Sequence, residues 1–177
     1  MGVGSSTKHS VSGARDMPVI IVEGPDGSGK TTLAQYLSYE LYLDYHHEGP
    51  TPIDVSPIDY YSQLLRAATN TVFDRLALGE RVYGPILRGS DRLGHSGWIT
   101  FQTLVCEMQA LQIMCLPSLN VCFEAWASGR EELFTNREQF VRTYDAFRHN
   151  TRNHYVYDWT KPFALFNLME FIHDNQG

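Results

Sequence analysis

The sequence predicts an α/β fold: a doubly wound parallel sheet of about five strands with helices on both faces. Short apolar runs rich in β-branched residues alternate along the chain with longer segments whose apolar residues recur at helical spacing. Strands that alternate with helices pair in parallel through right-handed crossovers. The 177 residues, 43% of them hydrophobic, suffice for one domain with a sizeable core, which we place at residues 17–177. Residues 1–16 are rich in Ser and Gly and predict a flexible tail.

The first half of the chain supplies three strands and two helices. Apolar residues 19–22 predict a buried strand, and Leu33, Leu37 and Leu41 give the segment after it a helical spacing. A second helix should begin with Ser56 as its N-cap and Pro57 in its first position. The expected elements in this half are a strand at 19–22, a helix at 30–43, a strand at 45–47, a helix from 57 and a strand at 71–73.

The second half begins with a segment, residues 76–97, that we expect to be irregular and Gly-rich. A loop of that length in a compact domain is usually functional. Pro117 should end a strand, and Thr160 should cap the last helix. The remaining expected elements are a helix at 98–110, a strand at 113–116, helices at 119–127 and 138–149, a strand at 155–157 and a helix at 162–173.

One segment between the first strand and the first helix carries a phosphate-binding pattern. Residues 24–31 fit GxxxxGK[ST], and a strand and a helix flank them, as the motif requires. Glycines turn consecutive N–H groups toward an anion, and the helix N-terminus adds its positive dipole end. This predicts a P-loop NTPase fold that binds ATP, with Lys30 on the β- and γ-phosphates and Thr31 on Mg²⁺. The expected nucleotide contacts are Gly24, Asp26, Gly27, Ser28, Gly29, Lys30, Thr31 and Thr32.

A second signal follows the strand at residues 71–73. Asp74 would lie at a strand end beside the loop, where it could bind the metal directly, bind it through water, or accept a proton from an attacking hydroxyl. Arg75 could grip an acceptor phosphate with its guanidinium fork. A structural ion pair between the two is the alternative. His46 and His47 lack further ligands at fitting spacing, which argues against a metal site there.

These pieces resemble the thymidylate kinase-like branch of the P-loop nucleoside and nucleotide kinases. The resemblance rests on residues 23–32, on the Asp74-Arg75 pair, and on the order of elements after residue 113. It implies that Asp26 faces the acceptor, that Asp74 serves the metal and Arg75 the acceptor phosphate. It also implies a lid at residues 129–136 with Arg130 and Arg137 as catalytic groups at its rim, and an adenine site bordered by residues 159–162.

The acceptor half departs from that family. The chain is short, and residues 78–89 are more similar to short kinases encoded by bacteriophages than to the usual thymidylate kinase continuation. Four arginines in this half could cover the acceptor or could pair with Glu80 and Asp91. Tyr83 and Trp98 could stack on a base or could belong to the core. The arginines are Arg75, Arg81, Arg88 and Arg92, and the expected substrate-binding residues are Asp26, Glu48, Arg75, Tyr83, Arg88 and Trp98.

We expect a kinase that transfers the γ-phosphate of ATP, with Mg²⁺, to a pyrimidine deoxynucleotide. One alternative is a bacteriophage DNA-modification kinase that phosphorylates 5-hydroxymethyluracil within DNA, although a net charge of −6 does not favour DNA. A third possible function is that of a nucleotide-hydrolysing switch. No run of residues is long and apolar enough to span a membrane. Three cysteines without CxxC spacing indicate reduced thiols and therefore a cytoplasmic protein. If a bacteriophage encodes the chain, this is the cytoplasm of the host. The sequence does not determine the oligomeric state, and a homodimer is among the states that it allows.

Overall fold

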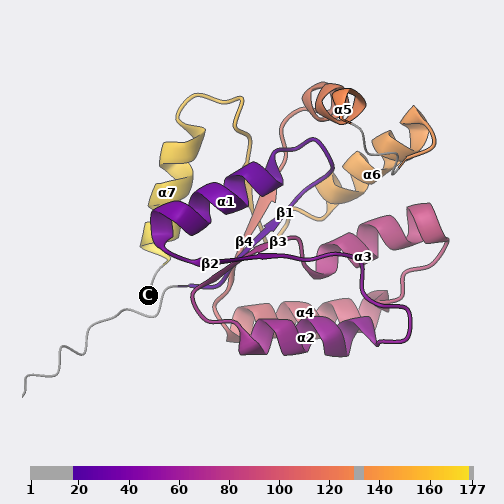
Figure 1. Ribbon diagram of the computed structural model, residues 1–177, viewed down its shortest axis with the longest axis horizontal. Helices are drawn as coiled ribbons and strands as arrows, with labels where there is room; N and C mark the ends of the chain where they lie inside the picture. The colour runs from indigo at the N-terminus through magenta and orange to yellow at the C-terminus, as the bar shows by residue number, and fades with distance from the viewer. Residues whose placement is uncertain (1–17, 130–133, 176–177) are drawn as a thin grey trace, which may run out of the picture.

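The computed structural model describes residues 18–129 and 134–175, so the predicted tail at residues 1–16 lies outside the described part. Its centre is one sheet of five parallel strands in the order β2-β3-β1-β4-β5 (Figure 1). This confirms the predicted doubly wound α/β fold. The strands are β1 (Ile20–Glu23), β2 (Asp44–His47), β3 (Thr71–Asp74), β4 (Leu111–Cys115) and β5 (Tyr155–Tyr157).

Helices cover both faces of the sheet (Figure 1). Side chains of β1 alternate between two cores, because successive strand residues point to opposite faces. Ile20 and Val22 pack in the core beneath α1 and α7, whereas Ile21 packs in the core beneath α2 and α4. The covering helices are α1 (Lys30–Leu41), α7 (Ala164–Asp174), α2 (Pro57–Ala67) and α4 (Gly94–Glu107).

A third core lies beyond the carboxyl end of β4 and contains most of the aromatic residues of the second half. It joins Met114 of β4 to α3 (Ala77–Tyr83), α5 (Leu119–Ser128) and α6 (Arg137–His149). Phe140 is 1% exposed there and stacks on Trp126, with 5.1 Å between ring centroids. These three helices therefore pack together beyond the carboxyl ends of the strands, where the phosphate loop follows β1.

The segment at residues 76–97 is not irregular, which corrects the sequence prediction. It contains α3, a π-helix η1 (Gly84–Arg88) and the first turn of α4. The buried carboxylate of Glu23 accepts hydrogen bonds from the Leu76 and Leu78 amides, at 2.9 and 3.2 Å, and so caps α3 from the end of β1. A cap supplied from outside the segment leaves no local sequence signal.

Of the two helix starts that the sequence predicted by their caps, α2 is confirmed and α7 is not. Ser56 occupies the predicted N-cap position of α2 but makes no capping hydrogen bond with its side chain. Thr160 does not cap the last helix: its hydroxyl donates to Asp158, and α7 begins after Phe163, whose backbone is left-handed. Within residues 18–129 and 134–175, no helix combines the length and apolarity that crossing a membrane requires.

Candidate active site

The phosphate loop joins β1 to α1 and packs tightly against its neighbours. Gly27 and Gly29 have φ angles of 72° and 86°, which side chains with a Cβ rarely adopt. A Cβ on Gly27 would collide with the Cys122 carbonyl oxygen and approach the Trp126 amide nitrogen to 2.9 Å. The close approach of α5 thus fixes the loop from outside, and Gly24 is similarly closed in by the Cys115 carbonyl.

Lys30 begins α1 and is buried, with 4% of its surface exposed. Its Nζ donates to the Pro25 carbonyl oxygen at 3.2 Å and lies 3.5 Å from Asp26 Oδ1. Burial lowers the pKa of Lys30 from its ordinary value, and the charge of Asp26 opposes this effect. The ammonium group therefore lies inside the loop, where the P-loop pattern places it.

Asp26 connects the two halves of the site. Its Oδ1 accepts a hydrogen bond from Arg75 Nη2 at 3.0 Å, and its Oδ2 accepts one from the Tyr83 hydroxyl at 3.0 Å. Arg75 comes from the end of β3 and Tyr83 from α3. Together with Lys30, these contacts place one carboxylate between three elements that are distant in the sequence.

Asp74 ends β3 and is fully buried. Its Oδ2 faces His47 Nδ1 at 2.8 Å and accepts a hydrogen bond from the Tyr45 hydroxyl at 3.0 Å. Burial by itself would raise the pKa of Asp74, but hydrogen bonding by Thr31, His47 and Tyr45 and the charge of Lys30 lower it. Oδ1 is buried without a partner of ordinary hydrogen-bond geometry among the described residues.

The residues at this point suit Mg²⁺. A partnerless carboxylate oxygen beside a threonine hydroxyl offers hard oxygen ligands, and Mg²⁺ in phosphotransferases takes one or two protein ligands with the rest from phosphate and water. The described residues hold no group of three or more acidic, His or Cys side chains that could bind a metal by itself. The chemistry therefore fits Thr31 and Asp74 as partial ligands.

Arg75 has the most unusual backbone at the site. Its φ of 71° is left-handed, a conformation that clusters at functional positions in residues other than glycine. Its amide donates to the Val22 carbonyl oxygen at 2.9 Å, which holds the residue beside β1. Its Nε is buried without a hydrogen-bond partner in the described part of the chain. The guanidinium thus keeps an unused donor next to the phosphate loop.

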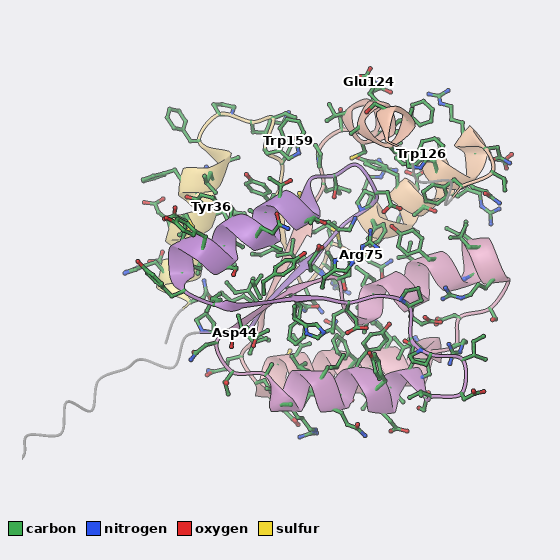
Figure 2. The ribbon with its side chains drawn as sticks, viewed as in Figure 1. Tyr36, Asp44, Arg75, Glu124, Trp126 and Trp159 are labelled. Carbon is green, nitrogen blue, oxygen red and sulfur yellow. The ribbon has the colours of Figure 1, made fainter. Side chains whose placement is uncertain are left out.

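A cavity of about 360 Å³ opens over the phosphate loop. Trp126 of α5 bounds it opposite the loop, while Arg75 lies below the loop toward α3 (Figure 2). The lining residues are Asp26, Gly27, Gly29, Lys30, Thr31, Arg75, Ala125, Trp126 and Gly129.

A second cavity, of about 100 Å³, lies beyond Arg75. Four of the predicted substrate-binding residues line it: Glu48, Arg75, Tyr83 and Arg88. Its other lining residues are Gly49, Pro50, Tyr61, Leu76, Gly79, Glu80 and Leu87.

The carboxylates of this second cavity are held by specific partners. Glu48 accepts hydrogen bonds from the Tyr60 hydroxyl at 2.9 Å and from the Gly49 amide at 3.2 Å, and His46 Nε2 lies 2.8 Å away. Glu80, which is 2% exposed, forms an ion pair with Arg88 at 2.8 Å. The cavity therefore combines apolar walls with two oriented acidic groups.

Three other predicted residues lie elsewhere. Trp98 does not line this cavity but stacks on Phe101 and carries Arg81 over its ring. Arg92 donates to backbone carbonyls in the Pro-rich loop that precedes α2. Arg137 begins α6 with its guanidinium over the Phe123 ring, and Arg130 lies outside the described residues.

A third cavity, of about 380 Å³, adjoins the other side of the loop. Trp159, which follows β5, donates from Nε1 to the Ser28 carbonyl oxygen at 2.9 Å. Trp159 and Trp126 thus approach the loop from different elements (Figure 2). The lining residues of this cavity are Gly29, Thr32, Leu33, Tyr36, Tyr157, Trp159 and Leu165.

Sequence reasoning missed several residues of this site. Glu23 supports α3, Tyr45 and His47 hold Asp74, and Trp126 bounds the phosphate cavity. The pair of Arg88 with Glu80, in contrast, is one of the two outcomes that the sequence left open. The alternation of Tyr45 and His47 on a strand that ends beside Asp74 was a usable signal. No comparable local signal marked Glu23 or Trp126.

Solved structures share this architecture. The YorR protein of Bacillus subtilis, determined with phosphorylated GDP, aligns with a TM-score of 0.70 and 18% identity over 88% of this chain and 98% of its own. Deoxyadenosine kinase from M. mycoides with bound dATP aligns with a TM-score of 0.61 and 15% identity over 88% of this chain and 99% of its own. The same enzyme with its products dCMP and dCDP aligns with a TM-score of 0.60 and 15% identity over 88% of this chain and 98% of its own.

At these identities the likeness establishes the fold. No family model matches the chain, and no curated protein matches it in sequence. The fold and the phosphate loop together define a P-loop protein. More narrowly, the chain has the P-loop kinase fold seen in these nucleotide-bound neighbours.

Proposed function

We propose that this protein is an ATP-dependent kinase that transfers the γ-phosphate to a pyrimidine deoxynucleotide. The observation that carries the proposal is the position of Arg75, which lines both the phosphate cavity and the second cavity. A group that borders both substrates can stabilise the charge that spreads over the transferring phosphoryl group. Its guanidinium also keeps one donor, Nε, that has no hydrogen-bond partner among the described residues.

On the donor side, the loop amides and Lys30 would hold the β- and γ-phosphates. Thr31 and Asp74 would hold Mg²⁺, which when bound neutralises phosphate charge and orients the transferring group. The apolar cavity between Tyr36 and Trp159 would take the adenine ring, because Trp159 is hydrogen-bonded to the loop itself. These residues do no covalent chemistry, and positioning and electrostatics would supply the catalysis.

On the acceptor side, size and polarity support a single-ring base. The cavity is small, at about 100 Å³, and so suits a single-ring base better than a double-ring base. Tyr61, Tyr83 and Leu87 supply flat or apolar walls. Glu48 would accept a hydrogen bond from a sugar hydroxyl, and Arg75 would bind the acceptor's own phosphate.

A kinase acting on 5-hydroxymethyluracil in DNA is the second candidate, and the bacteriophage-type stretch at residues 78–89 is what favours it. Such an enzyme needs unpaired basic groups to follow the phosphate backbone. Beyond Arg75, the arginines of this half are already engaged: Arg81 pairs with Asp91, Arg88 pairs with Glu80, and Arg92 donates to backbone carbonyls. This pairing supports the free nucleotide as acceptor.

A transfer assay tests the proposal. The protein is incubated with γ-labelled ATP and Mg²⁺ together with dTMP, 5-hydroxymethyl-dUMP, deoxynucleosides, or DNA that contains 5-hydroxymethyluracil. We expect label in a pyrimidine mononucleotide. Label only in DNA would favour the second candidate, and free phosphate with no labelled acceptor would favour a nucleotide-hydrolysing switch.

Two variants assign the roles. Lys30→Ala should abolish transfer to every acceptor, and an active variant would contradict the P-loop assignment. Arg75→Ala should raise the KM for a phosphate-bearing acceptor by at least tenfold, on the scale of a lost charge-assisted hydrogen bond. The matched control is Arg66→Ala, which removes an exposed arginine of α2.

A further inference from the structure

We propose that Tyr45 and His47 are positioning residues that fix the orientation of the Asp74 carboxylate at the metal–phosphate centre. The inference rests on the proposed function, since it assigns to Asp74 a role at that centre. It concerns two β2 residues whose side chains contact Asp74 and that are not among the lining residues of the three cavities described above.

The sheet register brings these side chains together. β2 is the edge strand and pairs in parallel with β3, so that His47 lies opposite Asp74 and Tyr45 lies opposite Val72. Tyr45 and His47 are two residues apart, which places both on one face of β2. From that face His47 Nδ1 and the Tyr45 hydroxyl reach the same oxygen, Asp74 Oδ2, at 2.8 and 3.0 Å.

Chemistry decides the direction of both hydrogen bonds. An aspartate that is ionised at neutral pH carries no proton, so its carboxylate oxygens can only accept. His47 must therefore donate from Nδ1, and Tyr45 must donate its hydroxyl proton. Two donors on Oδ2 resist rotation of the carboxylate and leave Oδ1, which has no hydrogen-bond partner among the described residues, as the oxygen available to the centre.

The contact with Asp74 is the specific feature of both residues. His47 is 48% exposed in its side chain and Tyr45 is 37% exposed, whereas the Asp74 side chain that both contact is completely buried. His46, the residue between them, turns to the other face, where it meets Glu48 and packs edge-on against Phe73. One short strand thus supplies an imidazole to each of the two carboxylates that flank Arg75.

Metal-dependent nucleotide binding tests the proposal without a turnover assay. Isothermal titration with a non-hydrolysable ATP analogue is carried out twice for each protein, once with Mg²⁺ and once with EDTA. Tyr45→Phe and His47→Ala should each weaken binding about tenfold with Mg²⁺, on the scale of lost support for a metal ligand, and less than twofold with EDTA. His47→Asn, whose amide can still donate to Oδ2, should stay within threefold of wild type in both.

The controls separate the possible failures. Tyr39→Phe removes the hydroxyl of an exposed α1 tyrosine and should change neither affinity. If wild-type protein binds no nucleotide, or if Lys30→Ala binds as well as wild type, the proposed function itself fails. If wild type binds normally and the β2 variants lose nothing, or lose equally with Mg²⁺ and with EDTA, the positioning role alone is overturned. Should His47→Ala not fold, Tyr45→Phe and His47→Asn decide the question.

Discussion

Replacing Glu23 by Gln should change how the stability of this protein depends on pH. Glu23 is 2% exposed at the end of β1, and its Oε1 accepts hydrogen bonds from the Leu76 and Leu78 amides that begin α3. Burial raises the pKa of Glu23 from 4.5 to about 7, although the two amides and the charges of Lys30 and Arg75 oppose the rise. Gln keeps an acceptor oxygen and removes the titration.

The sign follows from which state holds the proton. Between pH 4.5 and 7 the unfolded chain ionises Glu23 while the folded chain keeps it protonated, so wild-type stability is fully present below pH 4.5 and falls as the pH rises. The difference between 7 and 4.5 at ~1.36 kcal/mol per unit gives a loss of about 3 kcal/mol across this window. Glu23→Gln should not show that loss.

Urea unfolding followed by tryptophan fluorescence measures the effect at half-unit steps from pH 4.5 to 7.5. The informative quantity is the free energy of unfolding of Glu23→Gln minus that of wild type, because the other titrating groups cancel in it. It should increase by about 3 kcal/mol over the range. Glu40→Gln, on the exposed side of α1, reports what a lost surface charge does. A difference that stays flat with pH would refute the account of Glu23.

Other outcomes follow from single contacts. Burial lowers the pKa of His154 to about 4, so wild type should lose up to about 3 kcal/mol as the pH falls from 6.5 toward 4, and His154→Leu should not show that loss in the same urea assay. Gly27→Ala would force a Cβ into the Cys122 carbonyl at a left-handed φ and should cost about 2 kcal/mol, or roughly 5 °C in melting temperature by calorimetry. Arg88→Gln breaks the pair with Glu80 and should raise the acceptor KM about tenfold while leaving the KM for ATP unchanged.

The donor half was predictable because its signals are contiguous. Residues 24–31 form one loop, and the residues that precede and follow them carry the strand and helix patterns that place it. Asp74 and Arg75 follow a buried strand, so their position at the carboxyl end of the sheet followed from the strand itself. Local order along the chain was enough to bring these pieces together.

The acceptor half was less predictable because its elements depend on partners far away in sequence. α3 begins where Glu23, more than fifty positions earlier, caps its amides. The π-helix η1 then widens the turn before Arg88, and this residue pairs with the buried Glu80. Residues 76–97 are rich in glycine and charged side chains, and for this reason the sequence predicted an irregular segment there.

Asp26 connects these two halves. Its carboxylate lies 3.5 Å from Lys30 Nζ, and Lys30 lines the phosphate cavity. The same carboxylate accepts hydrogen bonds at 3.0 Å from Arg75, which lines both cavities, and from Tyr83, which lines the second cavity. Phosphoryl transfer by positioning requires that the donor and acceptor sites keep a fixed separation. The buried Asp26 carboxylate contacts Lys30 of α1, Arg75 at the end of β3 and Tyr83 of α3, so a shift of either cavity wall would break one of these contacts. Under the proposed function, Asp26 would therefore also determine where the acceptor is held.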